Sequence, residues 1–179
     1  MVERDLSVTV ASYNVHGCVG RDGVRDVPRI ARVLRELNAE VVALQEVVFG
    51  LSDAGEPEPV DLMAELSGFR VVCAPIFRSD GVHFGNALLT SLPVESARVI
   101  PLSVDGFEPR TALDVRLDAH GRPLRVIATH LGLAARERRW QVQRLLAELE
   151  RDLPDTTLLM GDINEWWLAG RPLRWLHRR

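Results

Sequence analysis

The sequence predicts an α+β fold built from two similar layers that meet at one site. Residues 6–46 follow the pattern strand, helix, strand, and residues 110–164 follow the pattern hairpin, helix, strand. In both stretches, polar residues come directly after apolar strands. A chain of 179 residues suits one domain with its own core, so we expect a single domain over residues 1–179.

The composition is that of a globular protein and argues against several classes of function. Hydrophobic residues make up 46% and charged residues 26%, and the net charge of −3 lacks the basic footprint of a tight DNA-binding protein. No apolar run approaches the ~20 residues that a transmembrane helix needs. Residues 1–5 show no signal peptide, and Cys18 and Cys73 form no metal or redox motif. These features predict a cytoplasmic protein with reduced thiols, and they indicate no specific protein partner.

The first layer carries polar residues at the ends of two strands. A β-rich strand over residues 6–13 leads to Asn14, and an apolar strand over residues 41–44 leads to Glu46. A turn-forming Asn and an exposed strand-end Glu are the ordinary interpretations. The alternative is that both face a metal or phosphate site, because a carboxylate beside a buried strand is costly unless it is exposed, paired or bound to metal. His16, in the loop after the first strand, is interpreted as a local loop contact.

Helices, short strands and loops fill the rest of the first half. Asp26 is expected to cap the first helix, and a second helix over residues 60–66 is expected to end at Gly68. Residues 77–85 are expected to form a loop. Flanking prolines favour an edge position for the last of three strands, which are expected over residues 69–73, 86–90 and 94–102.

The second layer repeats this design. An alternating strand over residues 110–117 pairs through a hairpin with a strand over residues 124–128, which leads to His130. A lone His at a strand end is usually a satisfied hydrogen-bonding residue. The helix expected over residues 135–149 has an apolar inner face. Its charged residues are expected to be solvated: Arg136, Glu137, Arg138, Arg139, Arg144 and Glu148.

The chain is organised around residues 157–164. An apolar strand over residues 158–160 ends at Gly161, and Asp162 and Asn164 follow with one residue between them. On an extended backbone both side chains point the same way. The carboxylate can orient or deprotonate a water, and the amide can hold an oxyanion. The alternative is a strand followed by an Asx turn.

Five short blocks together carry a resemblance to a known family. In this order and spacing they resemble the endonuclease/exonuclease/phosphatase superfamily of metal-dependent phosphodiesterases and phosphatases, over nearly the whole chain. The resemblance implies a sandwich of two mixed β-sheets flanked by helices, as in deoxyribonuclease I, with the site where strand tips converge. The blocks are Ser12-Tyr13-Asn14, Leu44-Gln45-Glu46, Gly85-Asn86-Ala87-Leu88-Leu89, Thr129-His130-Leu131 and Gly161-Asp162-Ile163-Asn164.

The resemblance also implies a metal. Glu46 would bind a divalent cation, with Asn14 near it. Carboxylate and amide oxygens suit Mg²⁺, with Mn²⁺ as the alternative, and the ion would keep several waters. We therefore expect the carboxylates of Glu46 and Asp162 to lie at the same end of the molecule.

The remaining roles implied by the resemblance are catalytic and substrate-binding. Asp162 would activate the attacking water, and Asn164 and His130 would hold phosphate oxygens as charge builds. Asn14 and Arg110 would complete the substrate site. Arg110 stands where some relatives place an Arg that faces the phosphate. The reaction would be in-line attack of water on the phosphorus of a phosphodiester or phosphomonoester, in a nucleic acid, a lipid headgroup or a small molecule.

One departure from the family pattern limits this expectation. Family members carry a Ser-Asp-His block after the Gly-Asp-x-Asn block, and this sequence has none. About 60 residues look absent against the usual size of such a domain, so the domain is expected to be C-terminally truncated relative to the family. Losing a general acid or base typically costs ~10²–10⁴-fold in rate. The expected activity is weak or absent, and the alternative function is a non-catalytic binding module.

Overall fold

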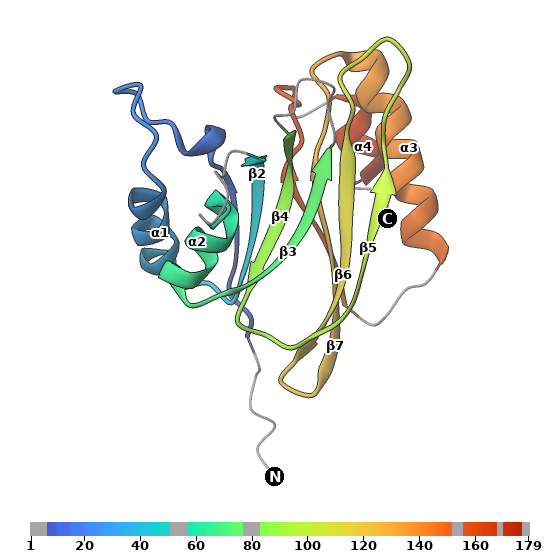
Figure 1. The fold of residues 1–179 in the computed structure, drawn as a ribbon. Helices are drawn as coiled ribbons and strands as arrows, with labels where there is room; N and C mark the ends of the chain where they lie inside the picture. The colour runs from blue at the N-terminus through green and yellow to red at the C-terminus, as the bar shows by residue number, and fades with distance from the viewer. Residues whose placement is uncertain (1–6, 51–56, 77–82, 152–155, 168–169, 177–179) are drawn as a thin grey trace.

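Two four-stranded β-sheets face each other, with α1 and α2 on the outside of one sheet and α3 and α4 on the outside of the other (Figure 1). This computed structural model describes residues 7–50, 57–76, 83–151, 156–167 and 170–176. The layered arrangement confirms the predicted sandwich. None of the helices in these ranges is both long and apolar enough to cross a bilayer.

The first sheet has the order β1-β2-β4-β3 and is mixed. β1 and β2 are parallel, because α1 crosses between them, and β4 pairs antiparallel with both β2 and β3. Asp26 caps α1 as expected, since its side chain accepts a hydrogen bond from the Arg29 N–H at 2.8 Å. The elements are β1 (Val10–Asn14), α1 (Val27–Glu36), β2 (Val41–Phe49), α2 (Pro59–Ser67), β3 (Arg70–Ile76) and β4 (His83–Thr90).

The second sheet has the order β5-β6-β7-β8 and is also mixed. β5, β6 and β7 form an antiparallel meander, whereas β7 and β8 are parallel and joined through α3. β5 lies at the edge of the sheet, as the flanking prolines predicted. The elements are β5 (Val94–Pro101), β6 (Thr111–Ala119), β7 (Arg122–His130), α3 (Ala135–Arg151), β8 (Thr157–Asp162) and α4 (Arg171–Leu176).

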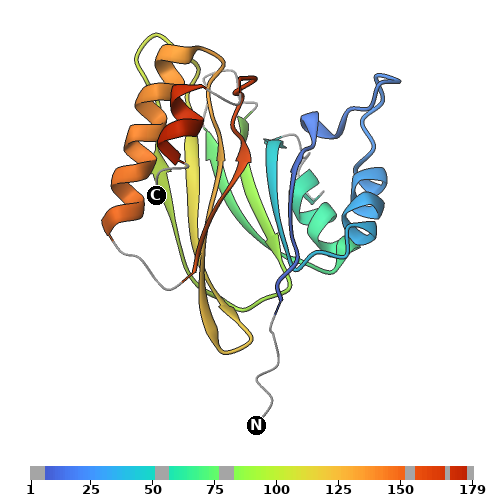
Figure 2. The same ribbon diagram turned by 180° about the vertical axis from the view of Figure 1, so that it is seen from behind.

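Apolar side chains fill the space between the two sheets. Strand residues that face inward from the first sheet, such as Val41 and Leu88, pack with Leu113, Val115 and Val126 of the second sheet. Full burial of a side chain of this size stabilises the fold by ~1.5–3 kcal/mol. Figure 2 shows β1 and β8 from behind, one strand from each sheet, and the two strands are in contact. This contact brings the two sheets together where their polar residues emerge.

Most boundaries shift by a few residues, and three of the differences bear on the site. β2 continues past residue 44 to Phe49, since Val47–Phe49 pair with β4 beyond an irregularity. Part of the expected loop at residues 77–85 belongs to β4, which begins at His83, and residues 77–82 lie outside the described ranges. Gly161 does not end its strand, because β8 continues to Asp162.

A buried ion cluster on the outer face of the second sheet was not expected. Arg125 is almost fully buried and donates to both carboxylate oxygens of Asp114, at 2.9 and 2.8 Å. Arg98 pairs with Asp114 at 2.6 Å and with Glu148 of α3 at 2.9 Å. The expectation that Glu148 is solvated is therefore wrong. The Glu148 carboxylate is buried beneath arginine side chains, whose guanidinium groups neutralise its charge. Its further partners are Arg144 and Arg151.

Candidate functional site

The two sheets deliver two carboxylates to one amide. The Asn14 Nδ2 group at the end of β1 donates to Glu46 Oε1 at 2.8 Å and to Asp162 Oδ2 at 3.3 Å. Glu46 belongs to the first sheet and Asp162 to the second. Both carboxylates therefore lie at the same end of the molecule, 116 positions apart in the chain (162 minus 46).

Glu46 protrudes because β2 bulges at this position. Leu44 pairs with Ala87 and Val47 with Gly85, so two residues of β2 oppose one residue of β4. Glu46 has a positive φ of 55° and is half-buried within an otherwise buried strand. The sequence predicted a carboxylate at a strand tip. The bulge achieves the same exposure inside a longer strand.

The surroundings of Glu46 favour its ionised form. Partial burial acts to raise the pKa of Glu46, but hydrogen bonds from Asn14 and His16 act against it, and the pKa lies below its ordinary value. His16 Nδ1 lies 3.0 Å from Glu46 Oε2. His16 thus reaches beyond its own loop, which the sequence analysis did not anticipate.

Asp162 is positioned by a glycine and a turn. Gly161 has a φ of 137°, and a Cβ atom there would lie 1.9 Å from the Thr129 carbonyl oxygen, so only glycine lets β8 approach β7 this closely. Asp162 Oδ1 accepts a hydrogen bond from the Asn164 N–H at 3.0 Å, which forms an Asx turn. The turn and a catalytic role for the carboxylate are compatible.

Asn164 does not lie beside Asp162 on an extended backbone. Its φ is 52°, in the left-handed region, so the predicted same-side arrangement is wrong. Its Nδ2 group instead donates to the Leu131 carbonyl at 2.8 Å, in the loop after β7. One amide hydrogen is used in this contact, and the second remains able to donate.

His130 lies beside Asp162 because β7 and β8 are parallel and in register at these two residues. Its Nε2 atom is 3.8 Å from Asp162 Oδ2. The pKa of His130 is lowered mainly by burial and further by the positive charge of Arg110. The imidazole is therefore neutral at pH 7.

Buried polar residues of α3 hold the loop that follows His130. The Gly132 N–H donates to Gln141 Oε1 at 2.9 Å, and Arg138 Nη1 donates to the Gly132 carbonyl at 3.2 Å. Glu137 accepts from Gln141 Nε2 at 3.0 Å. The prediction of a solvated helix face is wrong for Glu137 and Arg138, since both are buried under this loop.

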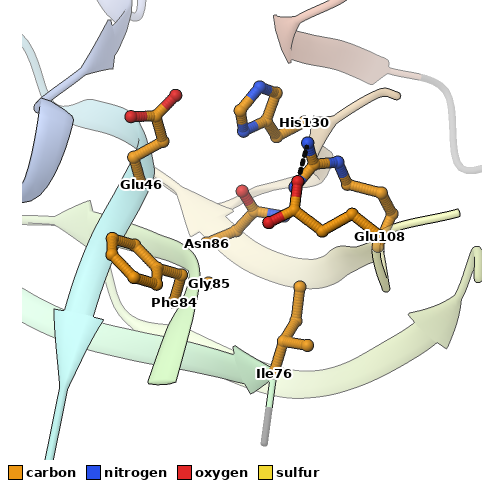
Figure 3. Close-up of a pocket in the computed structure, with 8 residues that line it drawn as sticks. Glu46, Ile76, Phe84, Gly85, Asn86, Glu108 and His130 are labelled. Carbon is orange, nitrogen blue, oxygen red and sulfur yellow. Dashed lines mark ion pairs between the residues drawn. The ribbon is translucent and has the colours of Figure 1, made fainter. Parts of the chain in front are cut away.

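A cavity of about 230 Å³ opens beside these groups (Figure 3). Arg110 lines it and is mostly buried, with Nη2 2.8 Å from Glu108 Oε2. Its Nε is buried and has no hydrogen-bond partner among the residues that the structure describes. Asn86 lines it too, and its Nδ2 group donates to the Thr111 carbonyl at 2.8 Å. The sequence analysis quoted Asn86 without a role and missed Glu108, for which the sequence offers no signal. Glu46 and His130 complete the polar lining.

The oxygen donors present suit a cation that keeps most of its waters. Within the described parts of the chain, no three His, Cys, Asp or Glu side chains are grouped to hold a metal. Mg²⁺ takes only one or two protein carboxylates, and Glu46 offers one that is ionised and half-exposed. Asn14 donates to this carboxylate, and its own oxygen accepts from the His16 N–H at 3.0 Å. In this orientation Asn14 positions Glu46.

A two-sheet sandwich with these polar groups at one end defines a class of phosphoester hydrolases. The chain belongs to the endonuclease/exonuclease/phosphatase family, whose model matches residues 11–179. This superfamily comprises phosphodiesterases, phosphatases and nucleases.

The chain is also similar to individual proteins. It is 29% identical to YbhP of Escherichia coli K12 over 96% of this chain and 72% of that protein. It is 27% identical to an endonuclease/exonuclease/phosphatase protein of Beutenbergia cavernae, with a TM-score of 0.72, over 89% of this chain. The match spans 48% of the Beutenbergia chain, about half its length. A mannosyl-6-phosphatase of Bacteroides thetaiotaomicron shares the fold at 19% identity, with a TM-score of 0.69 and coverage of 93% and 70% of the two chains.

Proposed function

We propose that this chain hydrolyses phosphate esters at a low rate, as expected without a Ser-Asp-His block, with a divalent cation, Mg²⁺ or Mn²⁺, held at Glu46. The observation that carries the proposal is the Asn14 amide, which ties the Glu46 and Asp162 carboxylates together at 2.8 and 3.3 Å. Two carboxylates from separate sheets that share one donor form a site in which one can hold a cation and the other can act on water.

Glu46 and Asn14 form the cation half of the site. Glu46 is ionised at neutral pH, and Asn14 fixes the orientation of its carboxylate. When bound, the cation supplies a Lewis acid and a template for the phosphate and water.

Asp162 and its neighbours form the other half. One oxygen of Asp162 accepts from the Asn164 backbone and the other from Asn14, which fixes the carboxylate in a position to accept a proton from water. Neutral His130 and the second amide hydrogen of Asn164 can donate to phosphate oxygens. Arg110 adds the positive charge that offsets charge developing on phosphorus-bound oxygens.

The proposal is tested by hydrolysis of bis-p-nitrophenyl phosphate with and without Mg²⁺. Asp162→Ala is expected to lower the rate by about 10²–10⁴-fold, because it removes the group that accepts the proton. Asp105→Asn, which changes an exposed carboxylate outside the cavity, is the matched control. Hydrolysis that needs no divalent cation, or a rate in Asp162→Ala equal to that of the control, contradicts the proposal.

A further inference from the structure

Glu108 forms an ion pair with Arg110, and both residues line the cavity. Its carboxylate lies 2.8 Å from Arg110 Nη2, and its side chain is 50% exposed whereas that of Arg110 is 12% exposed. We propose that Glu108 makes this site select singly charged phosphodiesters over doubly charged phosphomonoesters. The inference rests on the proposed function and names the substrate class of the same site.

The charge balance around the cavity favours the singly charged group. Among the described residues that line the cavity, Glu46 and Glu108 supply two carboxylates and Arg110 one guanidinium. A third carboxylate, that of Asp162, is joined to Glu46 through the Asn14 amide. Neutral His130 adds no charge. A divalent cation compensates the remaining two negative charges, so little attraction is left for a second negative charge on the substrate.

Arg110 has only part of its donor capacity left for a phosphate. Glu108 pairs with Nη2, and no residue in the described parts of the chain accepts a hydrogen bond from the buried Nε. A phosphodiester carries one charge over two non-bridging oxygens and can share the guanidinium with Glu108. A phosphomonoester dianion must compete for Arg110 while it is repelled by the Glu108 carboxylate.

The opposite wall of the cavity suits the second ester group. Ile76, Phe84 and Gly85 line it, and Figure 3 shows Phe84 and Ile76 on the side away from His130. Phe84 is 38% exposed, which leaves an aromatic surface for an uncharged substituent. A second ester group is what distinguishes a diester from a monoester, so shape and charge favour the same substrate class.

Titration calorimetry with two non-hydrolysable probes tests the selection without relying on activity. The singly charged probe is methyl phenylphosphonate, and the doubly charged probe is phenylphosphonate. Both are measured at pH 8.5 in the presence of Mg²⁺. The wild-type chain is expected to bind the singly charged probe more tightly. Glu108→Gln is expected to lower the preference for the singly charged probe by about three- to tenfold. The substitution removes a negative charge that repels the dianion about twice as strongly as the monoanion.

Asp105→Asn is the matched control, because it removes the same charge from the same loop at a residue that does not line the cavity. Glu108→Ser removes the charge with a different side chain and must shift the ratio in the same direction. An unchanged affinity ratio in either Glu108 variant, or an equal shift of that ratio in Asp105→Asn, overturns this inference but leaves the proposed function in place. Failure of the wild-type chain to bind either probe overturns the proposed function as well.

Discussion

At the scale of single residues, Gly161 sets how closely β8 approaches β7. Its φ of 137° lies in a region that other residues rarely adopt, and a Cβ atom would collide with the Thr129 carbonyl oxygen. Asp162 follows directly, so the space that glycine leaves free determines where this carboxylate lies.

Gly161→Ala is therefore expected to lower the free energy of unfolding by several kcal/mol, because backbone strain and a steric clash add. Gly121→Ala is the control, since Gly121 also has a positive φ, of 86°, but no atom of a described residue lies within 4 Å of an added Cβ. That control is expected to cost about 1–2 kcal/mol. Urea unfolding of both variants measures the difference, and equal losses contradict the steric explanation.

Which site residues were predictable depends on whether they follow a recognisable strand. Asn14, His130 and Asp162 lie at ends of strands whose apolar patterns are plain in the sequence, and the structure brings them together. The bulge at Glu46 was not predictable, because bulges leave the apolar pattern of a strand intact. Glu108 lies in the loop before β6, and its pairing with Arg110 at the site depends on tertiary structure.

At the scale of elements, α3 shows where a sequence pattern misleads. Its charged residues alternate with apolar ones at helical spacing, which is typical of a wet outer face. Glu137 and Arg138 are instead buried under the loop after β7, and Glu148 is buried against Arg98. A sequence pattern gives the period of a helix but not which polar residues find a buried partner.

The ion cluster between α3 and its sheet makes stability depend on pH. Burial acts to raise the pKa of Asp114, but its hydrogen bond with Arg125 and the charges of Arg125 and Arg98 outweigh it and hold the pKa below the ordinary 3.8. Below that ordinary value, the unfolded chain takes up a proton that the folded chain does not. The contribution of Asp114 to the free energy of unfolding is thus complete above about pH 4 and is lost as the pH falls further.

The measurement is the urea midpoint between pH 6 and pH 2.5. The wild-type chain is expected to lose more stability below pH 4 than a variant that combines Asp114→Leu with Arg125→Met, which has no such carboxylate. Glu95→Gln, an exposed acid of β5 outside the cluster, is the control and should retain the larger loss of stability seen in the wild type. The same acid dependence in the wild type and the double variant contradicts the assignment.

At the scale of the whole molecule, the site lies where the two sheets approach each other. Glu46 comes from one sheet and Asp162 from the other, and the apolar layer between the sheets fixes their separation. The sandwich itself was predictable, because each half repeats a strand–helix–strand pattern and the five motif blocks occur in order. The register between the sheets was not, since it arises from side-chain packing across the layer.

A cation bound at this junction should stabilise the entire fold. With Mg²⁺ at ten times its dissociation constant, the free energy of unfolding of the wild-type chain is expected to rise by about 1.4 kcal/mol. This corresponds to an increase in Tm of about 3–5 °C. Glu46→Gln is expected to abolish the gain, whereas Glu95→Gln, an exposed residue of β5, retains it. Thermal unfolding in Mg²⁺ and in EDTA measures this. Identical wild-type curves in the two conditions exclude a cation at Glu46.

The hydrogen bond between Asn14 and Asp162 joins residues 148 positions apart. During synthesis, the ribosome must therefore release almost the entire described chain before the second carboxylate reaches the first. Any shorter N-terminal product lacks Asp162 and cannot bring the two acids together. The paired carboxylates are thus among the last features that a newly made molecule acquires.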